Sequence, residues 1–178
     1  DRVDTALVRF DASVTPPPAV EEADARGMRC EVAFERGDVA EAQRLCGRGG
    51  DLGLDLRRAN LALATGNPSE AARLVEAALR GPGQSPFQLS RMMLQRSAIA
   101  LGAGDWKTAG RWARAADRAF PGYWLAEAFV AQSRALEGDT AGAEAAYRAI
   151  AARTGDPDVY GALAVLAEAR GDAAAMAR

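Results

Sequence analysis

The sequence predicts an all-α protein built from repeated antiparallel helix pairs, and three observations support this prediction. Hydrophobic residues make up 49% of the 178 residues but aromatic residues only 6%, an alanine- and leucine-rich composition that favours helices over β-sandwiches. A glycine followed by Asp or Asn recurs at Gly37, Gly66, Gly104, Gly138 and Gly171, with spacings of 29, 38, 34 and 33 residues. Each of these glycines lies between two helix-compatible stretches. A helix-turn-helix unit is therefore expected to repeat along the chain.

The predicted turns have the chemistry of helix ends. Glycine readily adopts the left-handed conformation that ends a helix, and the Asp or Asn after it can accept a hydrogen bond from the first amides of the next helix. Asp38 and Asn67 are each followed by a Glu three residues later, which is the capping-box pattern. Ser85 and Asp156 each precede a proline, a combination typical of the start of a helix. Both helices of a unit therefore have predictable boundaries.

Small residues mark the places where the two helices of a pair are expected to approach each other. In the fourth unit Ala131 lies in the middle of the first helix, and Ala143, Tyr147 and Ile150 follow one face of the second at i, i+4 and i+7. The earlier units have small residues at the same two positions, which are Ala59 and Ala71, Ser97 and Ala109, and Cys30 and Ala42. These positions are predicted to lie in the core.

The units resemble tetratricopeptide repeats, whose pattern of about 34 residues combines a small residue in the first helix, a Gly-Asp turn, an early alanine and an aromatic residue in the second helix, and a final proline. GDWKTAGRWARAADRAFP at 104–121 and GDTAGAEAAYRAI at 138–150 are examples of the match. The resemblance implies a right-handed α-solenoid whose first helices line the concave surface. Three units depart from the pattern, because Cys46, Val75 and Ala113 replace the aromatic residue, and GRGGD at 47–51 is expected to stop one helix early.

The chain is predicted to form a single array over residues 1–178. The repeats are expected at about 23–51, 52–89, 90–123 and 124–156, with a partial repeat at 157–178. Residues 1–18 are interpreted as a half repeat, because Ala6, Phe10 and Ser13 match the small, aromatic and branched or small positions of a second helix; a disordered acidic arm is the alternative. Since stacked repeats need polar capping helices, the array is expected to continue at both ends or to be an ordered fragment of a longer protein.

Composition excludes several classes of function. The chain has no histidine and two cysteines, which argues against Ser-His-Asp catalysis, histidine metal sites and thiolate zinc sites. The nucleotide-binding patterns GxGxxG and GxxxxGK[ST] are missing. A net charge of −2 with scattered arginines argues against nucleic acid, and no apolar run approaches the roughly 20 residues that span a bilayer. We expect no enzyme activity, no cofactor, no metal and no membrane insertion.

The predicted function is that of a scaffold that binds a peptide or partner protein through its concave groove. The residues expected to face this groove are Arg57, Asn60, Arg91, Gln95, Phe129 and Gln132. Arginine can bind a carboxylate through two parallel hydrogen bonds, and side-chain amides can bind an extended peptide backbone. These residues therefore suggest an acidic or C-terminal peptide as the ligand. The alternative is that they are ordinary solvated helix faces. A second hypothesis is a repeat region of a larger bacterial polypeptide, such as a transferase or an envelope or secretion assembly factor, that positions a neighbouring domain.

Composition indicates the cellular origin, and spacing bears on the state of the cysteines. A composition rich in alanine and arginine, with Lys107 as the one lysine, is typical of a GC-rich bacterial genome. We expect a soluble protein, with the cytoplasm and the periplasm both open. Cys30 and Cys46 would lie on the facing helices of one unit and could form a disulfide, but two buried thiols are favoured because such positions are often offset by a turn. The three tryptophans are expected to pack in the core or between repeats.

Overall fold

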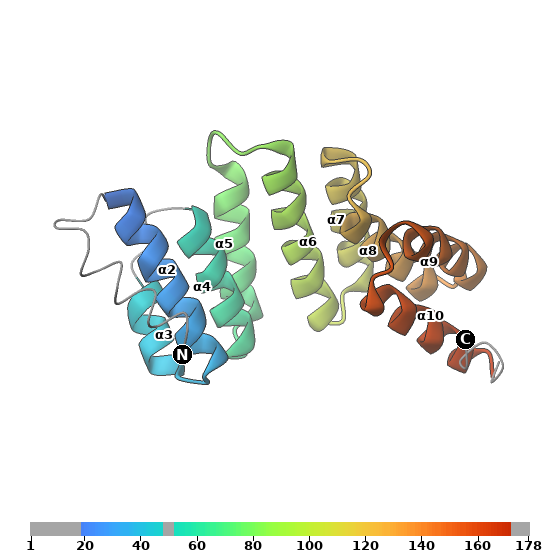
Figure 1. Cartoon of the computed structure of the whole chain (residues 1–178), viewed down its shortest axis with the longest axis horizontal. Coiled ribbons are helices and arrows are strands. Elements are labelled where there is room, and N and C mark those ends of the chain that lie inside the picture. The colour runs from blue at the N-terminus through green and yellow to red at the C-terminus, as the bar shows by residue number, and fades with distance from the viewer. Residues whose placement is uncertain (1–18, 48–51, 172–178) are drawn as a thin grey trace. The chain divides into compact units, whose positions relative to one another are not determined.

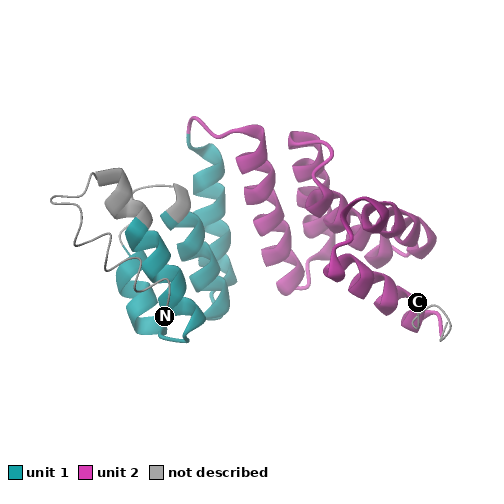
Figure 2. Ribbon diagram, in the orientation of Figure 1, with its two compact units in different colours: residues 1–81 teal, residues 82–178 magenta. Residues whose placement is uncertain are grey.

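The computed structural model describes residues 19–47 and 52–171, and these residues form helices joined by short turns (Figure 1). The helices are α2 (Ala19–Glu35), α3 (Val39–Cys46), α4 (Leu52–Ala64), α5 (Pro68–Arg80), α6 (Pro86–Gly102), α7 (Trp106–Ala119), α8 (Trp124–Leu136), α9 (Thr140–Thr154) and α10 (Pro157–Ala169). The chain divides into two compact units, unit 1 over residues 1–81 and unit 2 over residues 82–178 (Figure 2). The predicted half repeat at 1–18 and the end of the partial repeat at 172–178 lie outside the described residues.

Unit 1 contains two helix pairs, α2 with α3 and α4 with α5, and α4 also packs against both helices of the first pair. A single buried cluster joins α2, α3 and α4. It consists of Cys30, Ala33, Ala42, Leu45, Cys46, Leu54 and Leu61, with Phe34 packed against it. α5 buries four apolar side chains, Ala71, Leu74, Val75 and Ala78, at the spacing of one helix face.

Unit 2 also consists of paired helices. α6 pairs with α7, α8 pairs with α9, and α10 packs on α9, while α6 also contacts α8. One buried cluster consists of Leu94, Ala116 and Ala126. A second contains Ala131, Tyr147, Ile150, Ala151 and Val159, with Trp124 packed against it. Ala131, Tyr147 and Ile150, which were predicted to lie in the core, are buried in this one cluster.

The predicted helix ends are confirmed by backbone geometry. All five repeat glycines have a positive φ angle, between 70° and 94°. Residues other than glycine rarely adopt this backbone conformation. The residue after each of the first four glycines accepts a hydrogen bond from the amide three positions later, at 2.9 to 3.1 Å. Ser85 and Gln88 form a complete capping box, in which each side chain accepts from the backbone amide of the other residue. The turns are therefore set by local sequence.

Two of the predicted capping boxes differ from that at Ser85. The carboxylates of Glu41 and Glu70 bind the guanidinium groups one turn ahead, Arg44 at 2.5 Å and Arg73 at 2.6 Å. These hydrogen bonds lower the pKa of both carboxyls. Each glutamate thus forms an ion pair on the helix surface and does not cap the backbone. Its arginine partner, three residues later, offers a stronger, charge-assisted hydrogen bond than a backbone amide does.

The small residues at the two approach positions are buried in all four helix pairs, as predicted. The most exposed of these eight residues retains 2% of its accessible surface. In the third pair the hydroxyl of Ser97 also donates a hydrogen bond of 2.9 Å across the pair to the carbonyl oxygen of Ala109. The absence of a bulky side chain at these positions lets two helix backbones lie close together.

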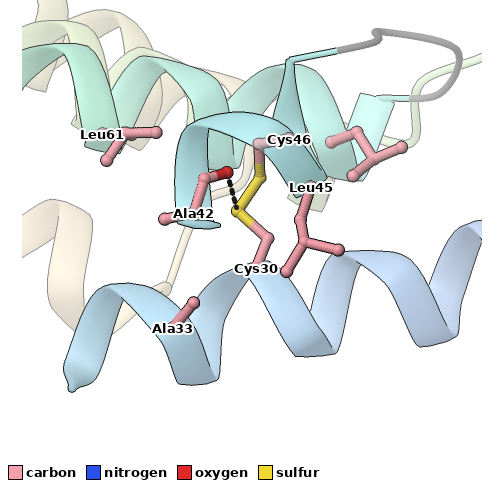
Figure 3. Close-up of a cluster of buried hydrophobic side chains, with 7 residues drawn as sticks. Cys30, Ala33, Ala42, Leu45, Cys46 and Leu61 are labelled. Atoms are coloured by element: carbon pink, nitrogen blue, oxygen red, sulfur yellow. Dashed lines mark hydrogen bonds between the residues drawn. A yellow bond between two sulfur atoms is a disulfide. The ribbon is translucent and has the colours of Figure 1, made fainter. Parts of the chain in front are cut away.

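Two expectations about cysteine and tryptophan are wrong. Cys30 and Cys46 form a disulfide with a Cα–Cα distance of 5.8 Å, so the two positions face each other directly and are not offset by a turn (Figure 3). Trp106 is 39% exposed, because it occupies the first turn of α7, where the ring turns outward and lies 5.2 Å from the Lys107 ammonium. Trp124 does pack against a buried cluster, as expected.

The observed helix boundaries also refine the predicted repeats. α3 has only eight residues and ends at Cys46, which confirms the expectation of an early stop before GRGGD. α6 begins at Pro86, inside the range 52–89 predicted for the second repeat. The Ser85 cap and Pro86 therefore begin the first helix of the third pair, as their sequence pattern predicted.

Candidate binding surface

In unit 2, one face of α6 presents aromatic, cationic and amide side chains in a row. Phe87, Arg91 and Gln95 follow one another at four-residue spacing, which places them on the same side of the helix. Phe87 is 40% exposed, Arg91 is exposed and Gln95 is half-buried. The guanidinium carbon of Arg91 lies 6.0 Å from the centre of the Phe87 ring, at the outer limit of a cation–π contact. We call these three residues the α6 stripe.

An aromatic cluster anchors the N-terminal end of the α6 stripe. The Phe87 ring lies edge-to-face with Phe120 and Tyr123, at centroid distances of 5.5 and 5.2 Å, and Phe120 and Tyr123 are 6.3 Å apart. Phe120 caps the end of α7 and Tyr123 precedes α8. The α7–α8 turn is therefore held against the start of α6. Sequence reasoning did not identify this cluster, although aromatic residues at helix ends are visible in the sequence.

α8 supplies the other two predicted residues of unit 2. Phe129 is half-buried and packs against the cluster of Leu94, Ala116 and Ala126, so part of its side chain stabilises the fold. Gln132 is exposed on the same helix. Since α6 contacts α8, the predicted site residues Arg91, Gln95, Phe129 and Gln132 belong to two neighbouring first helices of unit 2.

In unit 1 the predicted residues are Arg57 and Asn60 on α4. The Nε of Arg57 donates to a carboxylate oxygen of Glu31 on α2 at 3.3 Å. Gly27 makes room for this arginine, because a Cβ built on Gly27 would lie 3.0 Å from an Arg57 terminal nitrogen. Arg57 thus has a partner within the fold, which the sequence analysis missed. A carboxylate on the preceding first helix is the signal that could have indicated this partner.

Several other charged side chains of unit 2 form ion pairs within or between helices. Glu144 of α9 is buried and binds both Arg148, at 2.5 Å, and Arg170 after α10. Glu127 of α8 binds Arg153 of α9. The pairs of Glu144 with Arg170 and of Glu127 with Arg153 connect neighbouring helices of unit 2. The α6 stripe combines an exposed arginine with an exposed aromatic ring on one helix face.

Two other kinds of site are missing from the described residues. Within residues 19–47 and 52–171, no group of three His, Cys, Asp or Glu side chains could hold a metal ion. None of the helices over these residues is both long and apolar enough to cross a membrane. Tyr147 has a perturbed pKa, raised to about 12 by burial, which keeps the phenol neutral and makes it a packing group.

The architecture of both units defines a helix-pair repeat protein of the α-solenoid class. No protein-family model matches the sequence, and no curated protein matches it. Solved structures do resemble it. PilW, described as a widely conserved type IV pilus biogenesis factor, is 16% identical over 98% of this chain and 78% of its own, with a TM-score of 0.73. A tetratricopeptide repeat protein from Parabacteroides merdae is 15% identical over 98% of this chain and 70% of its own, with a TM-score of 0.72.

A third similar structure is YrrB, described as a tetratricopeptide repeat protein with an unusual peptide-binding site. It is 13% identical over 99% of this chain and 87% of its own, with a TM-score of 0.57. At these identities the similarity concerns the fold. The chain therefore has the tetratricopeptide-repeat fold, and the all-α fold class expected from the repeat pattern is confirmed.

Proposed function

We propose that the chain is a non-catalytic scaffold that binds an extended peptide segment of a partner protein along the first helices of its repeats. The observation that carries this proposal is the α6 stripe, where Phe87, Arg91 and Gln95 lie in a row beside α8. Tetratricopeptide-type architecture supports the general role, because stacked helix pairs create extended binding surfaces. The described titratable groups with lowered pKa lie at exposed helix starts and bind neighbouring side chains or amides, an arrangement of stabilising contacts.

The chemistry of the stripe favours a segment that carries a carboxylate. An arginine near an aromatic face can fork a carboxylate while the ring packs against an apolar side chain of the same segment. Gln95 and Gln132 have amides that can bond to an extended backbone. The description of YrrB as a peptide-binding protein of this fold supports the same class of ligand.

The two predicted arginines are expected to contribute unequally. Arg57 already binds Glu31 in unit 1, so a peptide carboxylate would have to displace that partner. Arg91 lies over the Phe87 ring and is exposed. We therefore place the main carboxylate contact on unit 2, at Arg91, and we propose a separate, weaker contact on unit 1, at Arg57 and Asn60.

A site-specific crosslinking experiment tests the proposal. A photoreactive amino acid placed at position 91 or 132, in cells that produce the protein natively, should crosslink one defined partner. Position 111 on the second helix α7 is the matched control, because Arg111 is also an exposed arginine and its recorded contact is a bond to Thr108 of its own helix. Equal crosslinking from positions 91 and 111 would contradict a first-helix binding surface.

The captured partner then allows the arginine hierarchy to be measured. Arg91→Ala should weaken binding about tenfold, which corresponds to about 1.4 kcal/mol, and Arg57→Ala should weaken it less. Arg111→Ala should leave the affinity unchanged. If Arg57→Ala and Arg91→Ala together left the affinity unchanged, the carboxylate would be excluded as the recognised group.

A further inference from the structure

The Cys30–Cys46 disulfide is not used by the proposed binding function, and its setting points to a separate property of the protein. It joins α2 to α3 in the buried cluster of unit 1, where Cys30 is 2% exposed and Cys46 is fully buried (Figure 3). The Sγ of Cys30 lies 3.4 Å from the carbonyl oxygen of Ala42. Solvent and other proteins have no direct access to either sulfur in the folded state.

The two cysteines occupy equivalent positions that are buried in each of the four helix pairs α2–α3, α4–α5, α6–α7 and α8–α9. Their separation of 16 residues is also the separation of the buried pairs at the same positions in the other units. These pairs are Ala59 and Val75, Ser97 and Ala113, and Ala131 and Tyr147. In the third pair, Ser97 reaches the carbonyl of Ala109, just as Cys30 lies against the carbonyl of Ala42. The disulfide thus lies where the other three pairs bury two side chains that are not covalently joined.

The first helix pair has a physical need for this bond. α3 has eight residues, whereas the corresponding second helices α5, α7 and α9 have 13, 14 and 15. Helices this short are unstable without tertiary contacts, and α3 buries only Ala42, Leu45 and Cys46. Cys46 is its last residue, so the disulfide fixes the end of α3 to α2.

Burial and position both distinguish this bond from a catalytic or sensing disulfide. Reactive cysteines are accessible and have a lowered thiol pKa, so that a thiolate can attack or be attacked. A buried bond between packing positions lacks this accessibility and persists where the surroundings are oxidising, as in the periplasm or outside the cell. We propose that Cys30–Cys46 is a permanent structural disulfide and that the protein folds and acts in an oxidising compartment.

Formation of the Cys30–Cys46 disulfide requires an oxidant. We assign this oxidant to the class of disulfide-bonded thiol oxidoreductases. A thiolate of the unfolded chain attacks the oxidoreductase disulfide and forms a mixed disulfide. The second cysteine then attacks this bond, so that an S–S bond joins Cys30 to Cys46. Two protons and two electrons leave the cysteine pair in total, and the oxidoreductase is released as a dithiol.

Thiol trapping in the organism that encodes the chain tests the proposal. Cells are quenched in acid, free thiols are blocked with N-ethylmaleimide, and the protein is digested with trypsin without reduction. Cleavage after Arg29, Arg36, Arg44 and Arg48 isolates the cysteines in peptides 30–36 and 45–48. We expect these peptides to be recovered almost entirely as one disulfide-linked species. Recovery of both peptides carrying N-ethylmaleimide would overturn the proposal.

Two controls make the outcome decisive. The Cys46→Ala variant leaves Cys30 without its disulfide partner and reports any oxidation that occurs during handling. In a second arm, the chain is produced in a reducing bacterial cytosol and purified with its cysteines reduced. A nonspecific protease should then cleave residues 25–46 of this reduced protein roughly 100-fold faster than those of the oxidised protein. If the reduced chain resisted the protease as well as the oxidised chain, the bond would not be structural.

Discussion

The helix pair α2–α3 of unit 1 and the pair α8–α9 of unit 2 have the same plan but are held together in different ways. Each pair has a small buried residue inside its first helix, Cys30 in α2 and Ala131 in α8. This small residue packs with a residue of the second helix that lies 16 positions later. In α8–α9 this residue is Tyr147, which belongs to a buried cluster with Ile150 and Val159. In α2–α3 it is Cys46, and the contact is covalent.

The comparison shows that one bond can substitute for a large buried area. α9 has 15 residues and buries five side chains, whereas α3 has eight and buries three. Closing a loop of about 15 residues is worth about 3 kcal/mol through the entropy of the unfolded chain, and burying a large side chain is worth a similar amount. A shortened repeat can therefore keep its place in the fold when its packing pair becomes a disulfide.

The strongest way to break the comparison is to remove the large side chain from α8–α9. Tyr147→Ala should lower the free energy of unfolding of unit 2 by about 3 to 5 kcal/mol, because it deletes a side chain that is only 6% exposed and leaves a cavity. Hydrogen exchange of the α8 and α9 amides measures this loss directly.

Tyr160→Ala is the matched control for this substitution. Tyr160 lies on α10 and is 52% exposed, so its removal should change the stability by less than about 0.5 kcal/mol. Equal losses for the two variants would contradict the assignment of Tyr147 to the packing contact of this pair.

A shift to alkaline pH tests the Tyr147 contact of α8–α9 without changing the volume of its side chain. Burial raises the pKa of Tyr147 from its ordinary 10 to about 12. A raised pKa means that the neutral phenol stabilises the fold fully below pH 10, and that this contribution is lost as the pH rises from 10 to 12, by about 2 to 3 kcal/mol in all. Chemical denaturation at pH 7 and 11.5 measures the loss.

The Tyr147→Phe variant should lack this particular alkaline loss, because it has no phenol to ionise. At pH 7 it should match the original protein within about 1 kcal/mol, since the ring is kept. An identical alkaline loss in the variant would assign the effect to other groups and not to Tyr147.

The smallest expected effect concerns the caps, which both units share. Asn67→Ala should destabilise α5 by about 1 kcal/mol, because the side chain accepts a hydrogen bond of 3.1 Å from the Glu70 amide. Asn67→Asp should restore the stability, since a carboxylate accepts the same bond. Thermal unfolding of the two variants tests this, and a loss with both would mean that the amide group has a role beyond capping.

Most of the fold could be predicted because its signals are local. Glycines with positive φ and capping side chains act within one turn, so Gly37-Asp38 and Gly138-Asp139 define their turns wherever the chain lies in space. Small residues at fixed spacing then predict which helix faces meet. The exposed position of Trp106 was missed, because a residue type alone does not reveal that the first turn of α7 points outward.

The disulfide and the candidate site were harder to predict because they depend on contacts between helices. Cys30 and Cys46 stand at the small and the aromatic positions of the repeat pattern, and Ala131 and Tyr147, which occupy these positions in the fourth unit, belong to one buried cluster. Applying that equivalence to the cysteines would have predicted the bond. The pairing of Arg57 with Glu31 depends on the distance between successive first helices, which repeat spacing does not specify.

The most direct test of this account measures hydrogen exchange of α2 and α3 in the oxidised protein and in the double variant Cys30→Ser, Cys46→Ala. The variant installs the pair that α6 and α7 use, Ser97 and Ala113, and so removes the bond but keeps a packable core. We predict that the protection of α2 and α3 falls by about 3 kcal/mol while that of α6 to α9 is unchanged. Equal protection of α2 and α3 in the two proteins would show that packing alone holds the first pair, and would contradict the account.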